Sequence, residues 1–441
     1  MLENMVDCCI LDLNLIFEER YLIMAVNANP VRGTRDYLPD EMRIRDKVQS
    51  IILDTYRQYG FERIGTPIME DIKNLTGSEG GENLSLIFKI LKRGQKLDLT
   101  QDNLTENDLV DSGLRYDLTV PLSRYYANNR SNLVFPFKCI QIDKVFRAER
   151  PQKGRYREFY QCDIDIVGDD SIHAEQELIY VTAQALLNIG FKDFTIRIND
   201  RRILNDIIKC AGFKEEDVSS VCIIFDKLDK IGLEGVDLEL HERGYDDVVI
   251  QKFMKMISSD DILDVEKVKQ FCSDEDAVLN LQSVIRNIAS ISEGRFNIVY
   301  DKSLVRGMGY YTGMVFEVAS KDFSSSIGGG GRYDKMIGKF MNESVPAVGF
   351  SIGFERICEI IKDKGMFKDE EEKKLVLIFN DEQTLPNMVE KMEELRSQGY
   401  IVSAKRRANK LGKQLDALAA HGFNYVLMFG EDDVPRVLNK K

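Results

Sequence analysis

The sequence contains few of the residues that usually build metal sites or catalytic proton relays. It has only three histidines, His173, His241 and His421, and none of its eight cysteines belongs to a Cys-x-x-Cys pair. Zinc sites and histidine catalysis need such side chains at close spacing. We therefore predict no metal site and no disulfide framework. We expect the three histidines to be ordinary surface or structural residues in a reduced, cytoplasmic protein.

Long apolar runs and a net positive charge are also lacking. No segment reaches membrane-spanning length, 30% of the residues are charged, and the net charge is -13. Such an acidic chain does not bind nucleic acid over its whole surface, so any RNA contact must use a local basic patch. We expect neither a membrane nor DNA as a partner. With 441 residues, the chain is long enough for two or three domains.

The most distinctive feature that is present is a basic stretch, Phe146–Val167. Five arginines or lysines lie in its first twelve residues, around a Pro-Gln-Lys-Gly turn, and apolar and polar side chains alternate afterwards through Asp163 and Asp165. This pattern predicts two antiparallel strands joined by a basic loop. A solvated hairpin is the commoner explanation of a basic turn. Arginines at this spacing also suit a polyphosphate, because a guanidinium group binds two phosphate oxygens at once.

This stretch resembles motif 2 of the class II aminoacyl-tRNA synthetases, and its residues are similar to those of the histidyl-tRNA synthetase family in particular. Other segments resemble the same family: the helix expected over Glu41–Tyr59 and the strand over Phe61–Met69 (motif 1), the stretch Leu304–Glu317 with the glycine-rich Ile327–Asp334, and Ala347–Ile357 (motif 3). Alone, a run of four glycines more often predicts a flexible turn. Together with the neighbouring segments that resemble the family, the glycine run suggests a stretch of backbone without side chains, which a substrate ring can approach closely. The sequence departs from the family at Gly309, where an acidic residue is usual.

The resemblance implies an α+β catalytic domain, an antiparallel sheet with helices, which is interrupted by a helical insertion and followed by a C-terminal α/β domain like those that bind anticodons. Strands and helices alternate after residue 374, which independently predicts a small α/β domain with a largely parallel sheet. Compared with the family, the resemblance implies that this domain is shortened at its end. We expect loops at 72–114 around a short strand, Leu86–Leu91. The expected parts are a disordered N-terminal extension (1–23), the first catalytic part (24–199), the helical insertion (200–290), the second catalytic part (291–362), a linker (363–374) and the α/β domain (375–441).

The resemblance also implies ATP-dependent activation of L-histidine, in which the amino-acid carboxylate attacks the α-phosphate of ATP and pyrophosphate leaves. This chemistry needs alignment and positive charge rather than a general base. The implied catalytic residues are Arg306 and Arg147. The residues implied to hold ATP, which would bind with Mg²⁺, are Arg147, Glu149, Arg155, Phe159 and Arg356. Those implied to hold L-histidine are Asp117, Thr119, Gln161, Asp165, Arg306, Tyr310 and Tyr311. Without the family, Asp117 is explained equally well as a cap where a strand leads into a helix.

The implied function is that of a homodimeric histidine–tRNA ligase, which transfers the activated histidine to tRNA(His). The alternative is a regulatory paralogue of the ATP phosphoribosyltransferase of histidine biosynthesis, which shares the catalytic fold but lacks the C-terminal domain. The retained arginines and the domain after residue 374 favour the enzyme. That domain carries a basic cluster, which is either a solvated face or a contact for RNA phosphates. Its members are Lys405, Arg406, Arg407, Lys410 and Lys413.

Overall fold

The computed structural model divides into two compact units, Met1–Asp363 and Lys364–Lys441. The boundary falls at the start of the linker that the sequence places at 363–374. The residues described are 27–78, 81–100, 103–259, 265–305, 310–367, 372–380 and 385–438. The expected N-terminal extension, 1–23, lies outside them. In the described part of the chain, no helix is both long enough and apolar enough to cross a membrane.

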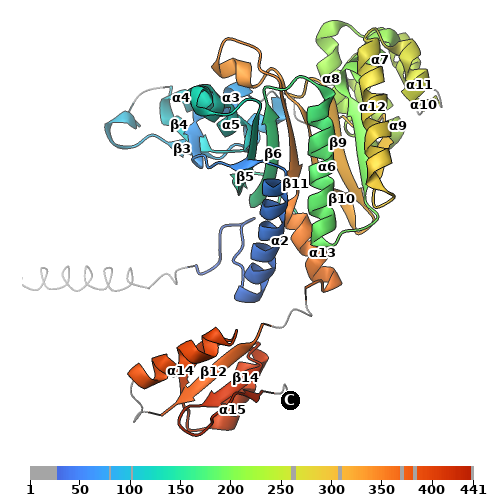
Figure 1. The fold of residues 1–441 in the computed structure, drawn as a ribbon. Coiled ribbons are helices and arrows are strands. Elements are labelled where there is room, and N and C mark those ends of the chain that lie inside the picture. Colours follow the sequence, from blue (N-terminus) through green and yellow to red (C-terminus); the bar gives the residue numbers. More distant parts are fainter. Residues whose placement is uncertain are drawn as a thin grey trace, which may run out of the picture. The chain divides into compact units, whose positions relative to one another are not determined.

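An eight-stranded sheet forms the centre of the first unit (Figure 1). Its order is β1-β5-β6-β11-β10-β9-β7-β8. Neighbouring strands are antiparallel except at the two edges, where β1 pairs with β5 and β8 with β7 in parallel. The strands are Glu62–Arg63 (β1), Phe137–Phe146 (β5), Glu158–Val167 (β6), Thr195–Asp200 (β7), Asn297–Tyr300 (β8), Met314–Ser320 (β9), Phe323–Arg332 (β10) and Ala347–Ile352 (β11). The predicted antiparallel sheet with helices is confirmed.

Two long helices, α2 (Pro39–Gln58) and α6 (Ile172–Ile189), pack against each other beside this sheet (Figure 1). The apolar stripe that predicted α2 is the face that it buries, since Val48, Ile52 and Tyr56 are fully buried. Residues three or four positions apart share one side of a helix, so a stripe at this spacing gives one continuous packing face. The prediction of a helix here is confirmed to within two residues at its start.

A small antiparallel sheet, β2-β4-β3, occupies the segment expected to be mostly loop. Its strands and the helices around it are Met69–Asp71 (β2), Ile72–Ser78 (α3), Lys89–Leu91 (β3), Glu106–Leu109 (α4) and Val110–Leu114 (β4). The loop prediction for 72–114 was therefore wrong in part, because scattered apolar residues such as Leu75 and Ile87 are buried in a shared core. The strand expected over Phe61–Met69 is broken as well. Only its ends are strands, and Pro67 between them has no N–H to donate to a neighbouring strand.

Strands β5 and β6 form the predicted antiparallel pair on either side of the basic loop. Their register runs from Phe137 opposite Val167 to Phe146 opposite Glu158. Successive side chains of a strand point to opposite faces of the sheet. On β6 the fully buried apolar set is Cys162, Ile164 and Ile166. The alternate, polar set is Gln161, Asp163 and Asp165. The strand therefore presents three polar side chains in a row on one face.

The glycine run lies inside a strand, which corrects the turn that four glycines alone would suggest. Residues Gly328–Gly331 belong to β10 and pair with β11 on one side and β9 on the other. A Cβ atom on Gly330 would lie 2.0 Å from the carbonyl oxygen of Gly349. Such a contact is impossible, so only glycine fits at this crossing of β10 and β11. The run thus serves close approach of backbones rather than a change of chain direction.

Between β7 and β8 the chain is helical, as the fold class predicts. The helices are Arg201–Ala211 (α7), Val218–Phe225 (α8), Leu228–Glu242 (α9), Asp247–Ser258 (α10), Val265–Val268 (α11) and Glu275–Ser292 (α12). Apolar side chains such as Ile208 of α7, Phe253 of α10 and Leu281 of α12 are fully buried. Helix α12 also packs against α6 and β8, which attaches this helical part to the edge of the large sheet (Figure 1).

The second unit is the predicted small α/β domain. Its sheet has the order β13-β12-β14-β15, with the first three strands parallel and β15 antiparallel. Its elements are Lys374–Phe379 (β12), Leu385–Ser397 (α14), Ile401–Arg406 (β13), Leu411–Ala420 (α15), Tyr425–Met428 (β14) and Arg436–Val437 (β15). On β12, Leu377 packs towards α14 and Ile378 towards α15. A parallel strand that is covered on both faces has a continuous run of apolar residues, which explains why the strand β12 could be predicted from the sequence.

Candidate active site

Two adjoining cavities lie in the first unit, along β6, β10 and β11. The outer cavity has a volume of about 170 Å³ and the inner one of about 90 Å³. The residues that line both are Arg147, Gln161, Gly329 and Ser351. Two ligands, one in each cavity, would therefore meet at these four residues.

The two sets of site residues that the sequence suggested separate between the two cavities. The outer cavity is lined by the whole ATP set, Arg147, Glu149, Arg155, Phe159 and Arg356. The inner cavity is lined by the described members of the histidine set, Asp117, Thr119, Gln161, Asp165, Tyr310 and Tyr311. Arg306, the other expected catalytic residue, and Gly309 lie outside the described residues. Positions that are up to 239 residues apart in the sequence are thus brought to one place, while their roles remain predictions.

Arg147 is the charged residue at the junction. It follows directly after β5, and its guanidinium carbon lies 4.3 Å from the ring centre of Tyr116 and 5.2 Å from that of Phe159. Its Nε donates a hydrogen bond to the backbone oxygen of Tyr116 at 3.2 Å. Aromatic faces attract a guanidinium group and restrict its position. The side chain is therefore held from two sides while it borders both cavities.

The two arginines Arg155 and Arg157 of the basic loop make different kinds of contact. The Nε of Arg155 lies 2.9 Å from a carboxylate oxygen of Glu149, and both side chains line the outer cavity. Arg157 instead donates hydrogen bonds to the backbone oxygens of Glu149, at 3.1 Å, and Arg32, at 3.2 Å. Gly33 packs on Arg157 with φ +91°, where an added Cβ would come within 2.8 Å of that side chain. Arg157 therefore fastens the loop to the segment before α2.

Arg356 and Phe159 border the outer cavity from different elements. Arg356 stands in the first turn of α13 (Phe354–Lys364) and donates a hydrogen bond to the backbone oxygen of Ser326. Phe159 is the second residue of β6. A flat aromatic ring and a planar guanidinium group are the two side chains that stack best on a purine. The outer cavity therefore has the side chains that an adenine ring needs.

A buried ion pair that the sequence did not reveal supports this cavity. Both terminal nitrogens of Arg45 on α2 donate to the carboxylate of Glu355 on α13, at 2.6 and 2.8 Å, and both residues are buried. Glu355 also accepts the backbone N–H of Tyr160 at 3.2 Å. This carboxylate thus ties β6 to α13, the elements that carry Phe159 and Arg356. The partners are 310 residues apart, so no local pattern could have identified the pair.

Buried carboxyl groups characterise the inner cavity. Asp165 accepts a hydrogen bond from the hydroxyl of Tyr333 at 2.7 Å. Burial raises the pKa of Asp165 to about 7, against the stabilising effect of that hydrogen bond. Burial, and then the neighbouring Asp165, raise the pKa of Asp163 well above its ordinary value. Burial also raises the pKa of Asp117. The cavity therefore concentrates acidic groups that favour a cationic or hydrogen-bond-donating ligand. Tyr333 was not expected from the sequence.

Asp117 forms the helix-capping bond that the sequence suggested and also borders the inner cavity, while its binding of substrate stays a prediction. One carboxylate oxygen accepts the backbone N–H of Val120 at 3.1 Å, in the first turn of α5 (Thr119–Asn129). The other oxygen lies 3.5 Å from the hydroxyl of Tyr310, and the residue lines the inner cavity. The helix-capping bond holds the carboxylate in place. Its second oxygen is thereby directed to the cavity side.

Glycines make room for the aromatic and acidic side chains of the inner cavity. A Cβ on Gly349 would lie 2.0 Å from a carboxylate oxygen of Asp165, and one on Gly331 would lie 2.9 Å from the ring of Tyr311. The rings of Tyr310 and Tyr311 are themselves 4.9 Å apart between centres. The backbone of β10 and β11 therefore forms one wall of the cavity without side chains, as the glycine run had suggested.

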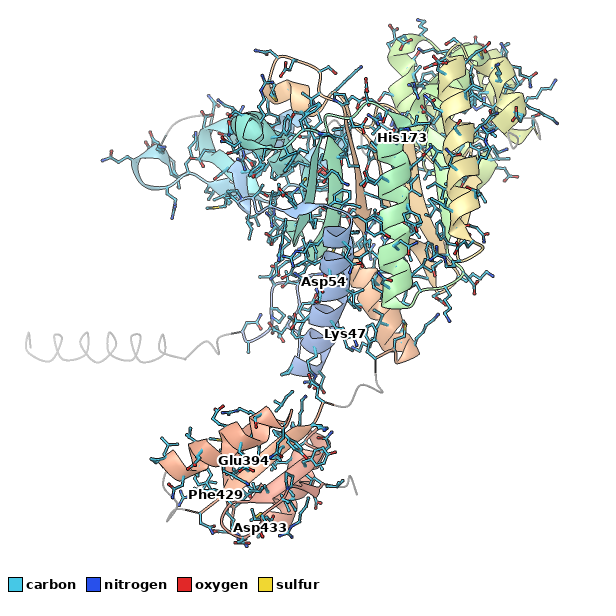
Figure 2. The ribbon with its side chains drawn as sticks, viewed as in Figure 1. Lys47, Asp54, His173, Glu394, Phe429 and Asp433 are labelled. Atoms are coloured by element: carbon cyan, nitrogen blue, oxygen red, sulfur yellow. The ribbon has the colours of Figure 1, made fainter. Side chains whose placement is uncertain are left out.

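None of the three histidines lines either cavity. His173 is exposed in the first turn of α6 (Figure 2). A ring nitrogen of His241 lies 2.8 Å from the backbone oxygen of Asp237, and one of His421 lies 2.7 Å from that of Ala417, each within its own helix. In the described ranges, no group of three or more His, Cys, Asp or Glu residues is arranged to hold a metal ion. The titratable chemistry of the site therefore rests on arginines, carboxyls and tyrosines.

Comparisons with known proteins show what this chain is similar to. The family model for histidyl-tRNA synthetase matches residues 33–357. A histidine–tRNA ligase of Leifsonia xyli is 41% identical over 426 residues, covering 94% of this chain and 98% of the relative. The crystal structure of histidyl-tRNA synthetase from Nostoc sp. has a TM-score of 0.74 and 29% identity, covering 92% of this chain and 93% of the other. A Bacillus halodurans structure described as an ATP phosphoribosyltransferase regulatory subunit/histidyl-tRNA synthetase has a TM-score of 0.72 and 19% identity, covering 90% and 96%. At that identity the likeness extends to the fold alone.

Proposed function

The chain belongs to the histidyl-tRNA synthetase family, and from this premise we propose how its two cavities perform the reaction of a histidine–tRNA ligase. The outer cavity binds ATP, and the inner cavity binds L-histidine. The observation that carries the proposal is the position of Arg147, which lines both cavities. The carboxylate of histidine and the α-phosphate of ATP must meet at one point, and a guanidinium group at that point can bind both anions.

In the outer cavity, Phe159 and Arg356 hold the adenine ring between them. Arg155 lies further along the basic loop and binds the terminal phosphates, while Glu149 keeps its guanidinium group oriented through their ion pair. A bidentate arginine suits a phosphate better than a point charge does, because its planar fork matches two oxygens. In this proposal Arg147 and Arg155 supply the positive charge that faces the triphosphate.

Mg²⁺ enters with the nucleotide. It requires oxygen ligands and retains several waters, so nucleotide phosphates usually supply much of its coordination. Glu149 contributes a carboxylate to the outer cavity, and no larger set of acidic ligands is present among the described residues. These residues fit a cation whose ligands are mainly phosphate oxygens, with one carboxylate of the protein beside them. When bound, the ion neutralises phosphate charge.

In the inner cavity, Asp165 accepts a hydrogen bond from the N–H of the imidazole ring, and Tyr311 forms a hydrogen bond with the other ring nitrogen. Asp117, Thr119 and Gln161 lie around the ammonium group. Leaving a buried hydrogen-bonding group unpaired costs about 1–3 kcal/mol. An amino acid without the two ring nitrogens would leave Asp165 and Tyr311 without these hydrogen bonds, so the cavity can reject that amino acid at the binding step.

The reaction itself needs no proton-transferring side chain. The histidine carboxylate is already a nucleophile, so the protein contributes alignment and compensation of the charge that builds on the pentavalent phosphate. Arg147 does this from the junction. Arg306, whose role rests on the sequence alone, is the second catalytic residue of the proposal. The absence of histidine from both cavities is therefore no obstacle to the chemistry.

Transfer to tRNA uses two basic surfaces. The loop Arg150–Arg157 borders the outer cavity and can steer the phosphates of an acceptor end, whose ribose hydroxyl attacks the adenylate. In the second unit, the basic cluster at 405–413 spans the end of β13 and the start of α15, where it can contact anticodon-loop phosphates. One of its members, Arg407, is paired with Glu431. Deleting residues 364–441 should therefore weaken aminoacylation of tRNA(His) more than it weakens adenylate formation.

We further propose that the enzyme is a cytoplasmic homodimer. Leu38 and Met42, at the start of the motif 1 helix α2, are exposed in the single chain, and a second copy related by a two-fold axis would cover them. The cysteines of the described residues are free, which suits a reducing compartment. Light scattering of the purified protein tests the dimer, and a monomeric mass at micromolar concentration would contradict it.

Histidine-dependent exchange of label between pyrophosphate and ATP tests the proposed reaction. An enzyme of this kind exchanges label only when L-histidine is present, whereas a regulatory paralogue of ATP phosphoribosyltransferase shows none. The regulatory alternative also lacks a C-terminal domain, which this chain has as a separate unit. Omission of histidine is the control. Exchange that is absent with histidine, ATP and Mg²⁺ all at saturation would overturn the proposed function.

A further inference from the structure

Asp163 is the middle member of the polar row on β6, between Gln161 and Asp165. Its side chain lines the inner cavity, and only 6% of its surface is exposed. The strand pairing places it opposite Ser351 on one side and Gln141 on the other. A carboxyl group at this position is costly to bury, so a purely structural role would require hydrogen-bond donors from the protein.

The protein supplies such donors to only part of this group, since Gln161 and Ser351 hydrogen-bond to Asp163 but leave one of its oxygens unpaired. Oδ1 of Asp163 and Oε1 of Gln161 are buried oxygens that accept no hydrogen bond within the described structure. The amide nitrogen of Gln161 lies 3.4 Å from the other carboxylate oxygen of Asp163 and 3.4 Å from the hydroxyl of Ser351. This contact fixes the amide so that its nitrogen faces Asp163 and Ser351. Its oxygen is left without a partner beside the cavity, like Oδ1 of Asp163.

We propose that Asp163 is a specificity-determining residue that binds the ammonium group of the amino-acid substrate together with Gln161. An ammonium group carries three N–H donors and no acceptor, which is the complement of two unpaired oxygens. The inference rests on the proposed binding of L-histidine in the inner cavity and adds a residue to that site. Asp163 would then share the three donors of the ammonium group with Asp117, Thr119 and Gln161.

The charge of the cavity supports the same ligand group. Three carboxyls, Asp117, Asp163 and Asp165, lie close enough to affect one another, while the positive charge of Arg147 acts on Asp163 in the opposite sense. The substrate carboxylate would occupy Arg147, which removes that compensation. A positive group on the same substrate restores it, because an opposite charge within a few ångströms favours the ionised carboxyl. A zwitterion therefore fits better here than an anion with the same ring.

The test compares two ligands that differ only in the amino group. L-histidine and 3-(imidazol-4-yl)propionate share the ring and the carboxylate. Their dissociation constants are measured by calorimetry with the wild-type protein and with Asp163→Asn. We expect the variant to bind histidine at least about tenfold more weakly, because a charge-assisted hydrogen bond is lost. The amine-free ligand should bind both proteins within about twofold.

Asp165→Asn is the matched control, two residues along the same strand and in the same cavity. It should weaken both ligands by a similar factor, because both carry the imidazole ring. Equal weakening of both ligands by Asp163→Asn, or no weakening of either, would overturn the inference. Failure of wild-type protein to bind L-histidine or to support exchange would instead overturn the proposed function, so the two outcomes can be separated.

A measurement on the wild-type protein alone covers the case in which the variant does not fold. Calorimetry in buffers of different ionisation enthalpy counts the protons released on binding. Binding of histidine at pH 6.5 should release protons, since its ammonium group drives the carboxyls of Asp117, Asp163 and Asp165 towards their ionised forms. The two imidazole rings differ in pKa, so the protons that each ring loses are first subtracted, using the titration of each ligand in solution. After that subtraction the amine-free ligand should release fewer protons. Equal proton release by the two ligands would contradict the inference.

Discussion

The two cavities share strand β6 but differ in the charged side chains that line them. The outer cavity gathers arginines from a loop and a helix, and Arg155 keeps 44% of its side chain exposed. The inner cavity gathers carboxyls from β6 and the start of α5, and Asp165 is 3% exposed. A phosphate-binding site can remain half open because its side chains are stable in water. In the inner cavity the acidic side chains are buried instead, and two oxygens there, Oδ1 of Asp163 and Oε1 of Gln161, have no hydrogen-bond partner among the described residues.

Replacing Arg147, the charged residue among the four that line both cavities, should have the largest effect. Arg147→Ala removes a guanidinium group that stabilises charge in the transition state, and such losses lower kcat by about 10²–10³-fold. Exchange of label at saturating histidine and ATP measures it. Arg147→Lys is the comparison, since it retains the charge without the planar fork and should be intermediate. A fall of less than about tenfold in Arg147→Ala would mean that the junction is not where the two substrates react.

The acidity of the inner cavity should appear in the stability of the ligand-free protein. The folded-state pKa of Asp165, about 7, is raised above its ordinary value, so the folded protein prefers the protonated carboxyl. The stabilising contribution is complete below about pH 4 and is lost as the pH rises through 7. The free energy of unfolding of the wild type, relative to Asp165→Asn, should therefore fall by about 4 kcal/mol between pH 4 and pH 8. Denaturant titrations of both proteins measure this difference, and a constant difference would contradict the buried-acid description.

Adding one methyl group should close the inner cavity while sparing the outer one. In Gly349→Ala the new Cβ would lie 2.0 Å from Asp165, so the aspartate must move. We expect an affinity for histidine lower by about tenfold to a hundredfold and a loss of stability of about 1–3 kcal/mol. Gly412→Ala is the control, because nothing lies within 4 Å of its added Cβ. Equal losses of histidine and ATP affinity would show that the cavities are not separable.

The smallest effect should come from the adenine end of the outer cavity. Arg356→Ala removes a cation that stacks on the purine, a contact worth about a factor of ten in affinity at a partly buried site. The KM for ATP should rise accordingly, and the KM for histidine should change by less than about twofold. Steady-state exchange kinetics with each substrate varied in turn separates the two constants. A larger rise in the KM for histidine than in the KM for ATP would contradict the assignment of Arg356 to adenine binding.

Local patterns predicted much of the fold because several elements have a regular periodicity. The stripe of α2 and the apolar run of β12 identified their elements directly. The glycine run was ambiguous, since its effect depends on Gly349, which belongs to a neighbouring strand. The loops expected at 72–114 turned out to contain a small sheet, because isolated apolar residues there find partners from other segments. Periodicity identifies an element only when its own residues supply most of its buried face.

The sequence by itself determined which chemical groups are available: arginines in a basic hairpin, paired carboxylates on the next strand, and no histidine placed to transfer protons. Only the tertiary structure decided which of them meet. Tyr333 reaches Asp165 across 168 residues, and Arg45 reaches Glu355 across 310. Strand order and helix packing create such contacts, and they depend on the burial of apolar surface throughout the unit rather than on any short stretch of residues. The division into two cavities is for that reason a property of the folded chain.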